Sequence, residues 1–218
     1  MAGSSSFPPP PWRLAGPAAV AGGLLPLHAA RRALPRGLSV LPVTPGHAIA
    51  ALILVRYGEG SVLSYSELGL LIGPVAGAGR LGGWVQGMWV DSEASRAGGR
   101  AIWGVPKELA RFEWLEDGRR RAVTVRDEAG ALLLRASWRR PAATIPLRAT
   151  SAFFGALEGP LRRGPMGGSF PGSPARMTVD APSDGPVAAL GLARRLPGWA
   201  GDFDGATGRA LVTPRAHA

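Results

Sequence analysis

Short apolar segments that end at turn-forming residues run along most of this chain. The apolar segment 47–57 ends at Gly58-Glu59-Gly60, and the alternating segment 110–116 ends at Asp117-Gly118, a dipeptide typical of tight hairpin turns. Glycine and proline, at 32 and 21 of 218 residues, also interrupt long helices. The sequence therefore predicts a mainly β fold of the α+β type, closed as a barrel or a double sheet, with a few short helices.

The predicted strands are short and separated by loops. We predict strands at 16–27, 38–43, 47–57, 62–72, 84–90, 110–116, 121–126, 131–138, 150–157 and 176–179. Short helices are predicted at 28–33, at 91–97 with Asp91 as the N-cap, and at 186–196. Residues 73–83 are predicted to form a glycine-rich hairpin loop. They contain the pattern GxGxxG, but no helix is predicted directly after it, so a dinucleotide-binding loop is not expected.

A single domain is expected between two ends of different composition. Residues 1–12, MAGSSSFPPPPW, are predicted to form a disordered Ser/Pro leader, residues 13–205 the domain, and residues 206–218 a loose tail. The apolar stretch 14–30 contains two prolines and no small-residue cleavage site. We therefore interpret it neither as a signal peptide nor as a membrane span, and we expect a cytoplasmic protein that does not enter a membrane.

The formal net charge is +10, but the distribution of the basic residues argues against a nucleic-acid partner. The arginines form scattered doublets and one triplet, Arg119-Arg120-Arg121, without interleaved aromatic residues or a known binding motif. We interpret them as a solvated surface. The chain has no cysteine, and its histidines at 28, 47 and 217 lack metal-binding spacing. We therefore expect neither a metal nor a cofactor.

Lys107 is the only lysine among 25 basic residues, and it follows the apolar sequence Ile102-Trp103-Gly104-Val105-Pro106. An imine with a carbonyl compound requires a neutral primary amine, which arginine cannot supply. A solvated lysine, with a pKa of about 10.4, is almost entirely protonated near neutral pH. Burial can lower the pKa of a lysine by several units. The apolar neighbours therefore favour Lys107 as a nucleophile over Lys107 as an incidental surface charge.

Residues 89–109, WVDSEASRAGGRAIWGVPKEL, resemble the segment of acetoacetate decarboxylases that carries the Schiff-base lysine, without gaps from Asp91 to Lys107. Upstream, Ser64-Tyr65-Ser66-Glu67 resembles the family's Tyr-x-Glu, whose carboxylate lies in the active site. In the order of its elements the resemblance covers residues 13–200. It implies an acetoacetate decarboxylase-like barrel or double sheet, with Lys107 and Glu67 as catalytic residues.

Three positions depart from the family pattern. Glu108 stands where the decarboxylases have a second lysine, Ala101 replaces the glutamate that follows Gly-Arg, and Leu52 falls at a further acidic pocket position. A carboxylate close to the catalytic amine would favour its charged form. Successive side chains of an extended segment point to opposite faces, however. We therefore expect Glu108 to face away from the pocket, with Arg100 or another arginine as its partner.

The resemblance implies a Schiff-base enzyme that acts on a small keto acid, most simply by decarboxylation. Glu67 would position the substrate or carry a proton, Trp103 and Tyr65 would help to enclose the amine, and Arg100 and Arg13 are further pocket candidates. Two alternatives stay open: aldol, dehydratase or cyclase chemistry through the same iminium, and a non-catalytic barrel that binds a small ligand. The expected partners are the keto acid and further copies of the chain in a homo-oligomer.

Overall fold

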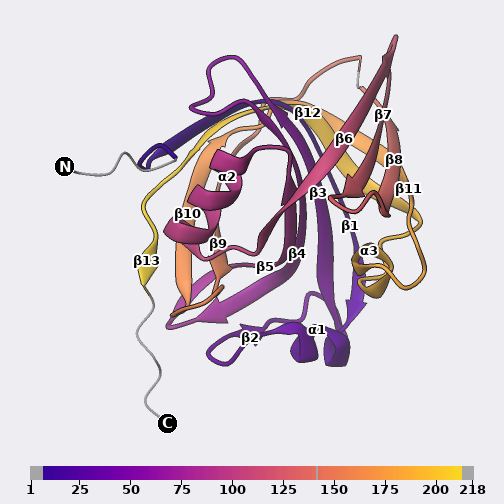
Figure 1. The fold of residues 1–218 in the computed structure, drawn as a ribbon. Helices are drawn as coiled ribbons and strands as arrows, with labels where there is room; N and C mark the ends of the chain where they lie inside the picture. Colours follow the sequence, from indigo (N-terminus) through magenta and orange to yellow (C-terminus); the bar gives the residue numbers. More distant parts are fainter. Residues whose placement is uncertain (1–6, 141, 213–218) are drawn as a thin grey trace, which may run out of the picture.

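Strands make up most of the computed structural model, which describes residues 7–140 and 142–212 (Figure 1). The strands are β1 (Trp12–Pro26), β2 (Ser39–Val40), β3 (His47–Tyr57), β4 (Tyr65–Gly77), β5 (Arg80–Val90), β6 (Lys107–Asp117), β7 (Arg120–Asp127), β8 (Leu132–Arg139), β9 (Arg148–Gly155), β10 (Arg162–Ser169), β11 (Gly172–Asp180), β12 (Arg195–Thr207) and β13 (Leu211–Val212). Between them lie the short helices α1 (Leu27–Ala33), α2 (Glu93–Gly98) and α3 (Pro186–Ala189) and the π-helical turn η1 (Gly99–Trp103). The mainly β prediction is confirmed.

Two strands, β5 and β12, each pair with three neighbours, because one edge of each strand is divided along its length. β5 pairs with β4 along one edge, while on the other edge residues 83–84 pair with β9 and residues 88–90 with β6. β12 pairs with β1 along one edge. On its other edge, residues 195–201 pair with β11 and residues 204–207 with β10. The sheet therefore forks at both strands.

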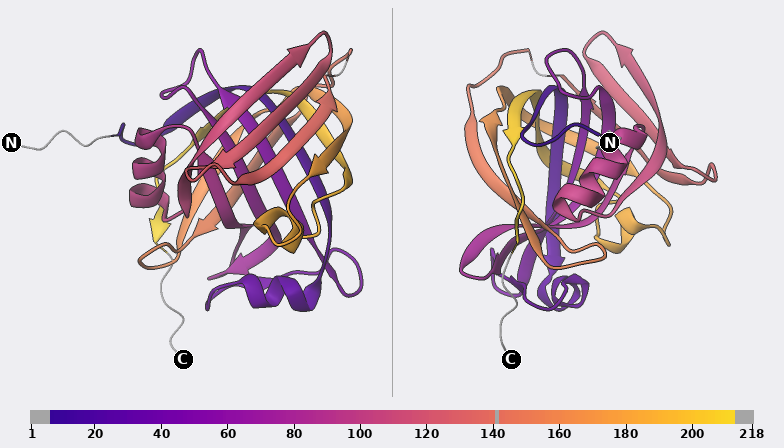
Figure 2. Two further views of the ribbon diagram at one scale, coloured as in Figure 1. Left: turned by 45° about the vertical axis from the view of Figure 1, so that its right-hand side comes forward. Right: turned by 60° about the vertical axis from the view of Figure 1, so that its left-hand side comes forward.

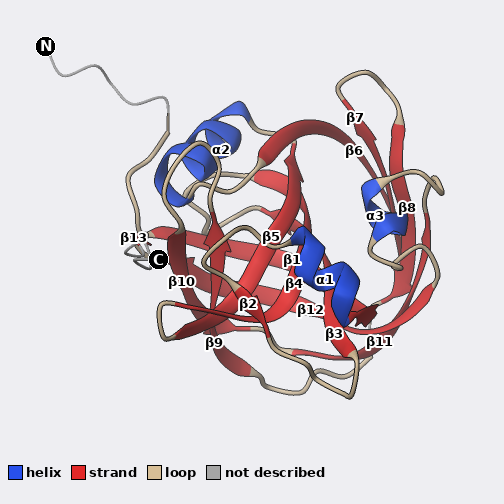
Figure 3. Cartoon of the chain, turned by 90° about the horizontal axis from the view of Figure 1, so that it is seen from below, coloured by secondary structure: helices blue, strands red, loops and turns tan. Residues whose placement is uncertain are grey.

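The forks close the strands of the described residues into two rings that share one wall. One ring runs through β5, β6, β7, β8, β11, β12, β1, β3 and β4, and the other through β5, β9, β10, β12, β1, β3 and β4. The shared wall consists of β12, β1, β3, β4 and β5. Further views show the strands curving around the molecule (Figures 2 and 3). The predicted closed barrel is confirmed, and the dividing wall inside it is an additional finding.

Alternate residues of the shared wall point into the two rings, as the period of a β-strand requires. In β3, Leu52 and Leu54 are fully buried in a core that also contains Val125 of β7 and Leu134 of β8. Val55 belongs to a second cluster of buried residues, rich in aromatic side chains, on the opposite face. The first face thus holds a packed core, and the second face borders the cavity described below.

The glycine-rich segment 73–83 is a hairpin of two strands, not the predicted loop. β4 and β5 continue through it and turn at Ala78-Gly79. A Cβ atom on Gly82 would lie 2.8 Å from the carbonyl oxygen of Ala152 in β9. Glycine here permits close approach of a neighbouring strand, which a reading of glycine as a loop signal does not anticipate.

The N-cap of α2 is Ser92 and not the predicted Asp91. The side-chain oxygen of Ser92 accepts a hydrogen bond from the backbone N–H of Ser95 at 3.2 Å. Asp91 instead accepts a hydrogen bond from the backbone N–H of Ser66 at 2.6 Å and so ties the start of α2 to β4. The two residues are equally good caps by type, and the tertiary contact decides between them.

The predicted helix 186–196 is limited to the four residues of α3, and residues 195–207 form a strand. Glycine, proline and aspartate in residues 197–205 hide any alternating pattern. The strand β12 forms because β1, β10 and β11 supply its backbone partners. β10, at residues 162–169, was likewise not predicted.

Both ends of the domain extend beyond the predicted boundaries. Trp12 is 1% exposed and opens β1, so it does not belong to a disordered leader. Residues 206–207 belong to β12 and residues 211–212 form β13, so this part of the predicted loose tail is structured. The rest of the predicted leader and tail, residues 1–6 and 213–218, lies outside the described residues. Among the described helices, none combines the length and apolar character needed to cross a membrane.

Candidate active site

Lys107 is the first residue of β6, at the point where β5 changes partner from β9 to β6. Its backbone pairs with Met88 of β5. The residue is only 4% exposed, and its Nζ donates hydrogen bonds to Oε2 of Glu67 at 2.7 Å and to Oγ of Ser95 at 2.9 Å. Nζ also lies 5.0 Å from the centre of the Tyr65 ring. The lysine that the sequence singled out is therefore buried and paired with the predicted carboxylate.

The two glycines that precede Arg100 make room for Lys107 and for Trp12. A Cβ atom on Gly99 would lie 2.5 Å from Cδ of Lys107, and a Cβ atom on Gly98 would lie 2.5 Å from the Trp12 ring. After η1 the chain reverses at Gly104, which has a φ of +64°, in the left-handed region that glycine adopts freely. The Gly-Gly-Arg segment therefore packs directly on the stem of the lysine.

Glu67 lies on β4 between two tyrosines, the only ones in the chain. Tyr65 donates a hydrogen bond to Oε2 of Glu67 at 3.4 Å, and the rings of Tyr57 and Tyr65 are 4.8 Å apart. Burial, reinforced by the negative charge of Glu67, raises the pKa of both tyrosines well above the ordinary value. Both hydroxyl groups are therefore protonated donors across the physiological pH range.

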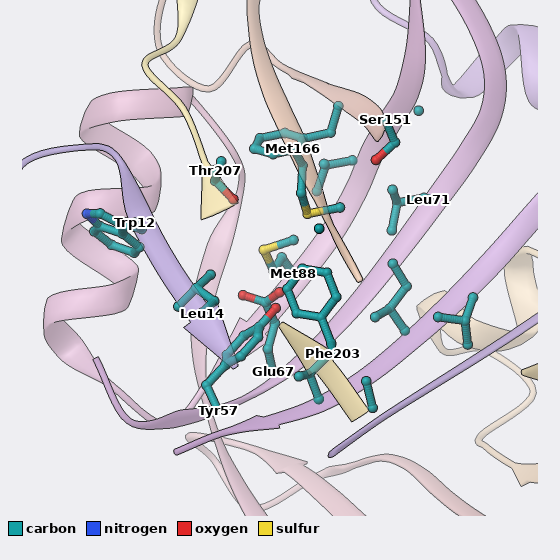
Figure 4. A pocket seen from close by; sticks show the side chains of 18 of the residues that line it. Trp12, Leu14, Tyr57, Glu67, Leu71, Met88, Ser151, Met166, Phe203 and Thr207 are labelled. Atoms are coloured by element: carbon teal, nitrogen blue, oxygen red, sulfur yellow. The ribbon is translucent and has the colours of Figure 1, made fainter. Parts of the chain in front are cut away.

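A cavity of about 370 Å³ opens over this cluster, between the shared wall and the pair β9 and β10 (Figure 4). Most of the side chains that line it are apolar. They are Trp12, Leu14, Ala18, Val20, Ile53, Val55, Leu71, Val85, Met88, Trp103, Val105, Leu147, Ala149, Ala152, Phe153, Met166, Phe170 and Phe203. The polar side chains are Tyr57, Tyr65, Glu67, Lys107, Ser151 and Thr207. Among the described residues that line the cavity, Lys107 is the only basic one.

The two predicted pocket arginines do not line the cavity. Arg100 turns outward, where Nε donates to the backbone oxygen of Lys107 at 2.6 Å and Nη2 pairs with the carboxylate of Glu108. Arg13 is exposed and pairs with Asp204 at 3.2 Å. The prediction that Glu108 faces away from the pocket with an arginine as its partner is confirmed, and the arginine is Arg100. Arg100 therefore supports the backbone of the lysine from outside.

The remaining family departures also lie away from the lysine. Leu52 is fully buried in the packed core on the other face of the shared wall. Ala101 is exposed, and its carbonyl oxygen accepts a hydrogen bond from Arg162 at 2.5 Å. Trp103 and Tyr65 do line the cavity, as predicted.

The sequence reasoning missed Ser95, Tyr57 and Trp12. Ser95 is fully buried in α2, and no spacing rule links it to a lysine twelve residues later. Tyr57 had a usable signal, because it pairs directly with Tyr65 across the turn between two apolar segments. Trp12 was hidden by the proline-rich sequence before it. Its ring packs edge-on against Trp103 with centroids 4.9 Å apart.

Sequence comparison identifies the family of the chain. The sequence model of the family described as acetoacetate decarboxylase (ADC) matches residues 2–154. The chain belongs to the acetoacetate decarboxylase family. Acetoacetate decarboxylase 3 of Mesorhizobium japonicum is 44% identical over 54 residues, and acetoacetate decarboxylase 1 of Bradyrhizobium diazoefficiens is 51% identical over 47 residues. These matches cover 25% and 22% of this chain and 21% and 18% of the two relatives.

Solved structures of the acetoacetate decarboxylase fold superpose on nearly the whole chain. The enduracididine biosynthesis enzyme MppR, complexed with pyruvate, has a TM-score of 0.72 at 18% identity, covering 96% of this chain and 93% of MppR. The acetoacetate decarboxylase of Legionella pneumophila has a TM-score of 0.68 at 16% identity, with coverages of 97% and 91%. An acetoacetate decarboxylase-like enzyme from Sphingomonas wittichii has a TM-score of 0.69 at 17% identity, with coverages of 97% and 96%. The predicted family fold is confirmed.

Proposed function

We propose that this protein forms an imine between Lys107 and the carbonyl carbon of a small keto acid and that it releases CO2 from a β-keto acid. The observation that carries the proposal is the buried contact of 2.7 Å between Nζ of Lys107 and Oε2 of Glu67 at the wall of an apolar cavity. A lysine in this setting has a carboxylate within reach to take its proton and apolar walls that keep water away.

The first stage converts the ammonium into an imine. Glu67 accepts a proton from Nζ, and the neutral amine adds to the carbonyl carbon of the substrate. Glu67 then returns the proton to the carbinolamine oxygen, which leaves as water, and a protonated imine remains. Ser95 accepts a second N–H of Nζ and holds the amine in a fixed direction. The stage therefore converts the ammonium and the carbonyl group into a protonated imine and one molecule of water, and Glu67 ends as a carboxylate.

The second stage breaks the bond between the α-carbon and the carboxylate. Its electron pair moves toward the positive nitrogen, so that CO2 leaves and a neutral enamine forms. The described cavity lining offers the carboxylate no basic side chain besides the lysine itself, and an uncompensated charge is unfavourable among apolar walls. Loss of CO2 removes this charge. Protonation of the enamine carbon and hydrolysis then release the ketone and restore Lys107.

A condensation reaction through the same iminium is the second candidate. MppR, whose fold is similar, has been solved with pyruvate and with the condensation product of pyruvate and imidazole 4-carboxaldehyde. An enamine formed on Lys107 would attack an aldehyde instead of taking up a proton. Release of CO2 distinguishes the two reactions, because condensation retains the carboxylate.

The test is borohydride reduction of the protein in the presence of acetoacetate or pyruvate, followed by intact mass and peptide mass measurement. Lys107 is the only lysine, so a lysine-linked adduct identifies it directly. Lys107→Arg keeps the charge and is the matched control, which we expect to give no lysine adduct. Absence of an adduct at Lys107 in the protein without substitutions would overturn the proposed imine chemistry and favour the alternative of a non-catalytic barrel that binds a small ligand. With an adduct present, measurement of CO2 release decides between decarboxylation and condensation.

A further inference from the structure

The floor of the cavity is laid out in rows by the register of β1, β3 and β4. Glu67 lies in one row with Ala18 and Val55. The next row on the same face consists of Val20, Ile53 and Gly69. Successive rows are about 7 Å apart, because each row advances two residues along the strands. The floor is thus entirely apolar one row beyond the catalytic carboxylate.

The third row carries the apolar floor further along β4, to Leu71. Leu71 lines the cavity, as Ile53 and Val20 do. It lies on the far side from Tyr57 and Trp12, with Ser151 beside it (Figure 4). The distance from Glu67 to Leu71 along the strand is about 13 Å. The polar cluster around Lys107 therefore occupies one end of the cavity, and the other end offers only apolar contacts along its floor.

The cavity is larger than acetoacetate requires. Its volume of about 370 Å³ lies within the range of about 300–1,000 Å³ that is typical of pockets for drug-sized ligands. Acetoacetate is a much smaller molecule, with four carbons and three oxygens. A keto acid with eight carbons and three oxygens adds four apolar carbons, which can extend from the catalytic end along the apolar rows of the floor.

We infer that the substrate is a β-keto acid with a medium-length apolar chain on the far side of its keto group, and that this chain lies over the rows of Val20, Ile53 and Leu71. The inference rests on the proposed imine chemistry of Lys107 and specifies the substrate class. Burying each additional methylene group on this floor removes apolar surface from water. Chain length should therefore increase kcat/KM until the cavity is full.

Gly69 lies beneath the side chains of Leu71 and Met88, which line this part of the cavity. A Cβ atom on Gly69 would lie 3.5 Å from Leu71, 3.6 Å from Met88 and 3.8 Å from Ile53, all ordinary contact distances. A methyl group therefore fits at this position without displacing a neighbour. The additional carbons of a valine would extend beyond Cβ against Leu71 and Met88 and would push these lining side chains into the space assigned to the substrate chain.

The experiment compares CO2 release from acetoacetate, 3-oxohexanoate, 3-oxooctanoate and 3-oxodecanoate. We expect kcat/KM to rise by about fourfold per methylene group up to 3-oxooctanoate, the factor that corresponds to about 0.8 kcal/mol per buried methylene. In Gly69→Val, the ratio of kcat/KM for 3-oxooctanoate to that for acetoacetate should fall at least tenfold. Val20→Phe narrows the same row from β1 and tests the same point if Gly69→Val fails to fold. Gly58→Val makes the same chemical change where a Cβ meets open space, and it should keep the ratio of the unmodified protein.

The outcomes separate this inference from the proposed function. A trapped adduct at Lys107 with acetoacetate, together with a kcat/KM that stays level or falls with chain length, would overturn the substrate class and leave the imine chemistry standing. If no keto acid is trapped, the imine chemistry fails, and calorimetric binding of 2-octanone against acetone then tests the chain channel alone. Stronger binding of 2-octanone that weakens in Gly69→Val would support the channel, and equal binding of both ketones would overturn it.

Discussion

Gly99 lies so close to Lys107 that a Cβ atom on its backbone would be 2.5 Å from Cδ of the lysine. Gly99→Ala should therefore push the lysine stem away from Glu67 and Ser95. We expect a loss of about 100-fold in the rate of imine formation, the size of effect that a 1 Å displacement of a reacting group can produce. Borohydride reduction of samples taken at successive times, followed by mass measurement, gives this rate. Gly58→Ala, in open space, is the control, and an unchanged rate in Gly99→Ala would show that this contact does not position the amine.

Glu67→Gln should destabilise the protein and slow imine formation, because it leaves a buried ammonium without its carboxylate. Breaking a buried ion pair from one side typically costs about 3–5 kcal/mol, and loss of a proton acceptor about 100-fold to 10,000-fold in rate. Urea unfolding and borohydride trapping measure the two effects. The double variant Lys107→Met/Glu67→Leu should regain the lost stability while remaining unable to form an imine. A double variant as unstable as Glu67→Gln would contradict this account.

Ser95→Ala should remove one of the two hydrogen-bond acceptors of the Lys107 ammonium. A hydrogen bond to a charged buried group contributes about 1.5–3 kcal/mol, so unfolding by urea should occur at a clearly lower concentration. Imine formation should also slow, because the amine loses its fixed direction. Ser92→Ala removes the N-cap of the same helix, at a cost of about 1 kcal/mol, without touching Nζ. Equal trapping rates in the two variants would argue against a role for Ser95 in orienting the amine.

Glu108→Ala should have little effect on either stability or activity. The carboxylate is half-exposed and pairs with Arg100 outside the cavity, and surface ion pairs contribute about 0–1 kcal/mol. We expect kcat/KM to change less than about threefold. A large gain in activity would instead mean that the charge of Glu108 acts on Lys107 through the protein and hinders the reaction.

The two tyrosines give the folded protein a distinct alkaline titration. Burial raises the pKa of Tyr57 and Tyr65 above the value near 10 that they have in the unfolded chain, so their neutral forms stabilise the fold. This stabilisation is complete below pH 10. It declines as the pH rises from 10 through the folded pKa, by about 1.4 kcal/mol per pH unit for each tyrosine. Tyrosinate absorbance should therefore appear only as circular dichroism reports unfolding. Ionisation of either tyrosine at pH 10 in the folded protein would contradict the raised pKa.

Local sequence patterns were sufficient to predict the elements that have a clear apolar segment and a clear turn at its end. β3 was predicted with its observed bounds, because the apolar segment 47–57 ends at a clear turn. The hairpin at Asp117-Gly118 formed as expected between β6 and β7. Lys107 stood out because it is the only lysine and follows apolar residues, and the structure buries it together with Trp103 and Val105.

Long-range pairing determined what the sequence did not reveal. β12 contains glycines and aspartates that suppress any local strand signal, and it is a strand because β1, β10 and β11 supply its backbone partners. The residue type of Arg100 suggested a contact with an anionic substrate. Its outward position depends on the path of η1 and on the ion pair with Glu108, which only the folded chain shows. Ser95 reaches Lys107 because α2 packs over the start of β6, a relationship that requires the folded chain.

The wall shared by the two rings assigns neighbouring residues of one strand to separate tasks. In β4, Leu68 and Leu70 fill the packed core, while Glu67 and Leu71 face the cavity. A substitution on the cavity face can therefore reshape what the protein accepts without disturbing the layer that holds it folded. In a mutational scan of β3 and β4, substitutions at the core-facing positions should therefore destabilise the protein, and substitutions at the alternating cavity-facing positions should leave its stability nearly unchanged. Substrate selectivity can therefore change one cavity-facing residue at a time, and these positions are suitable targets for engineering it.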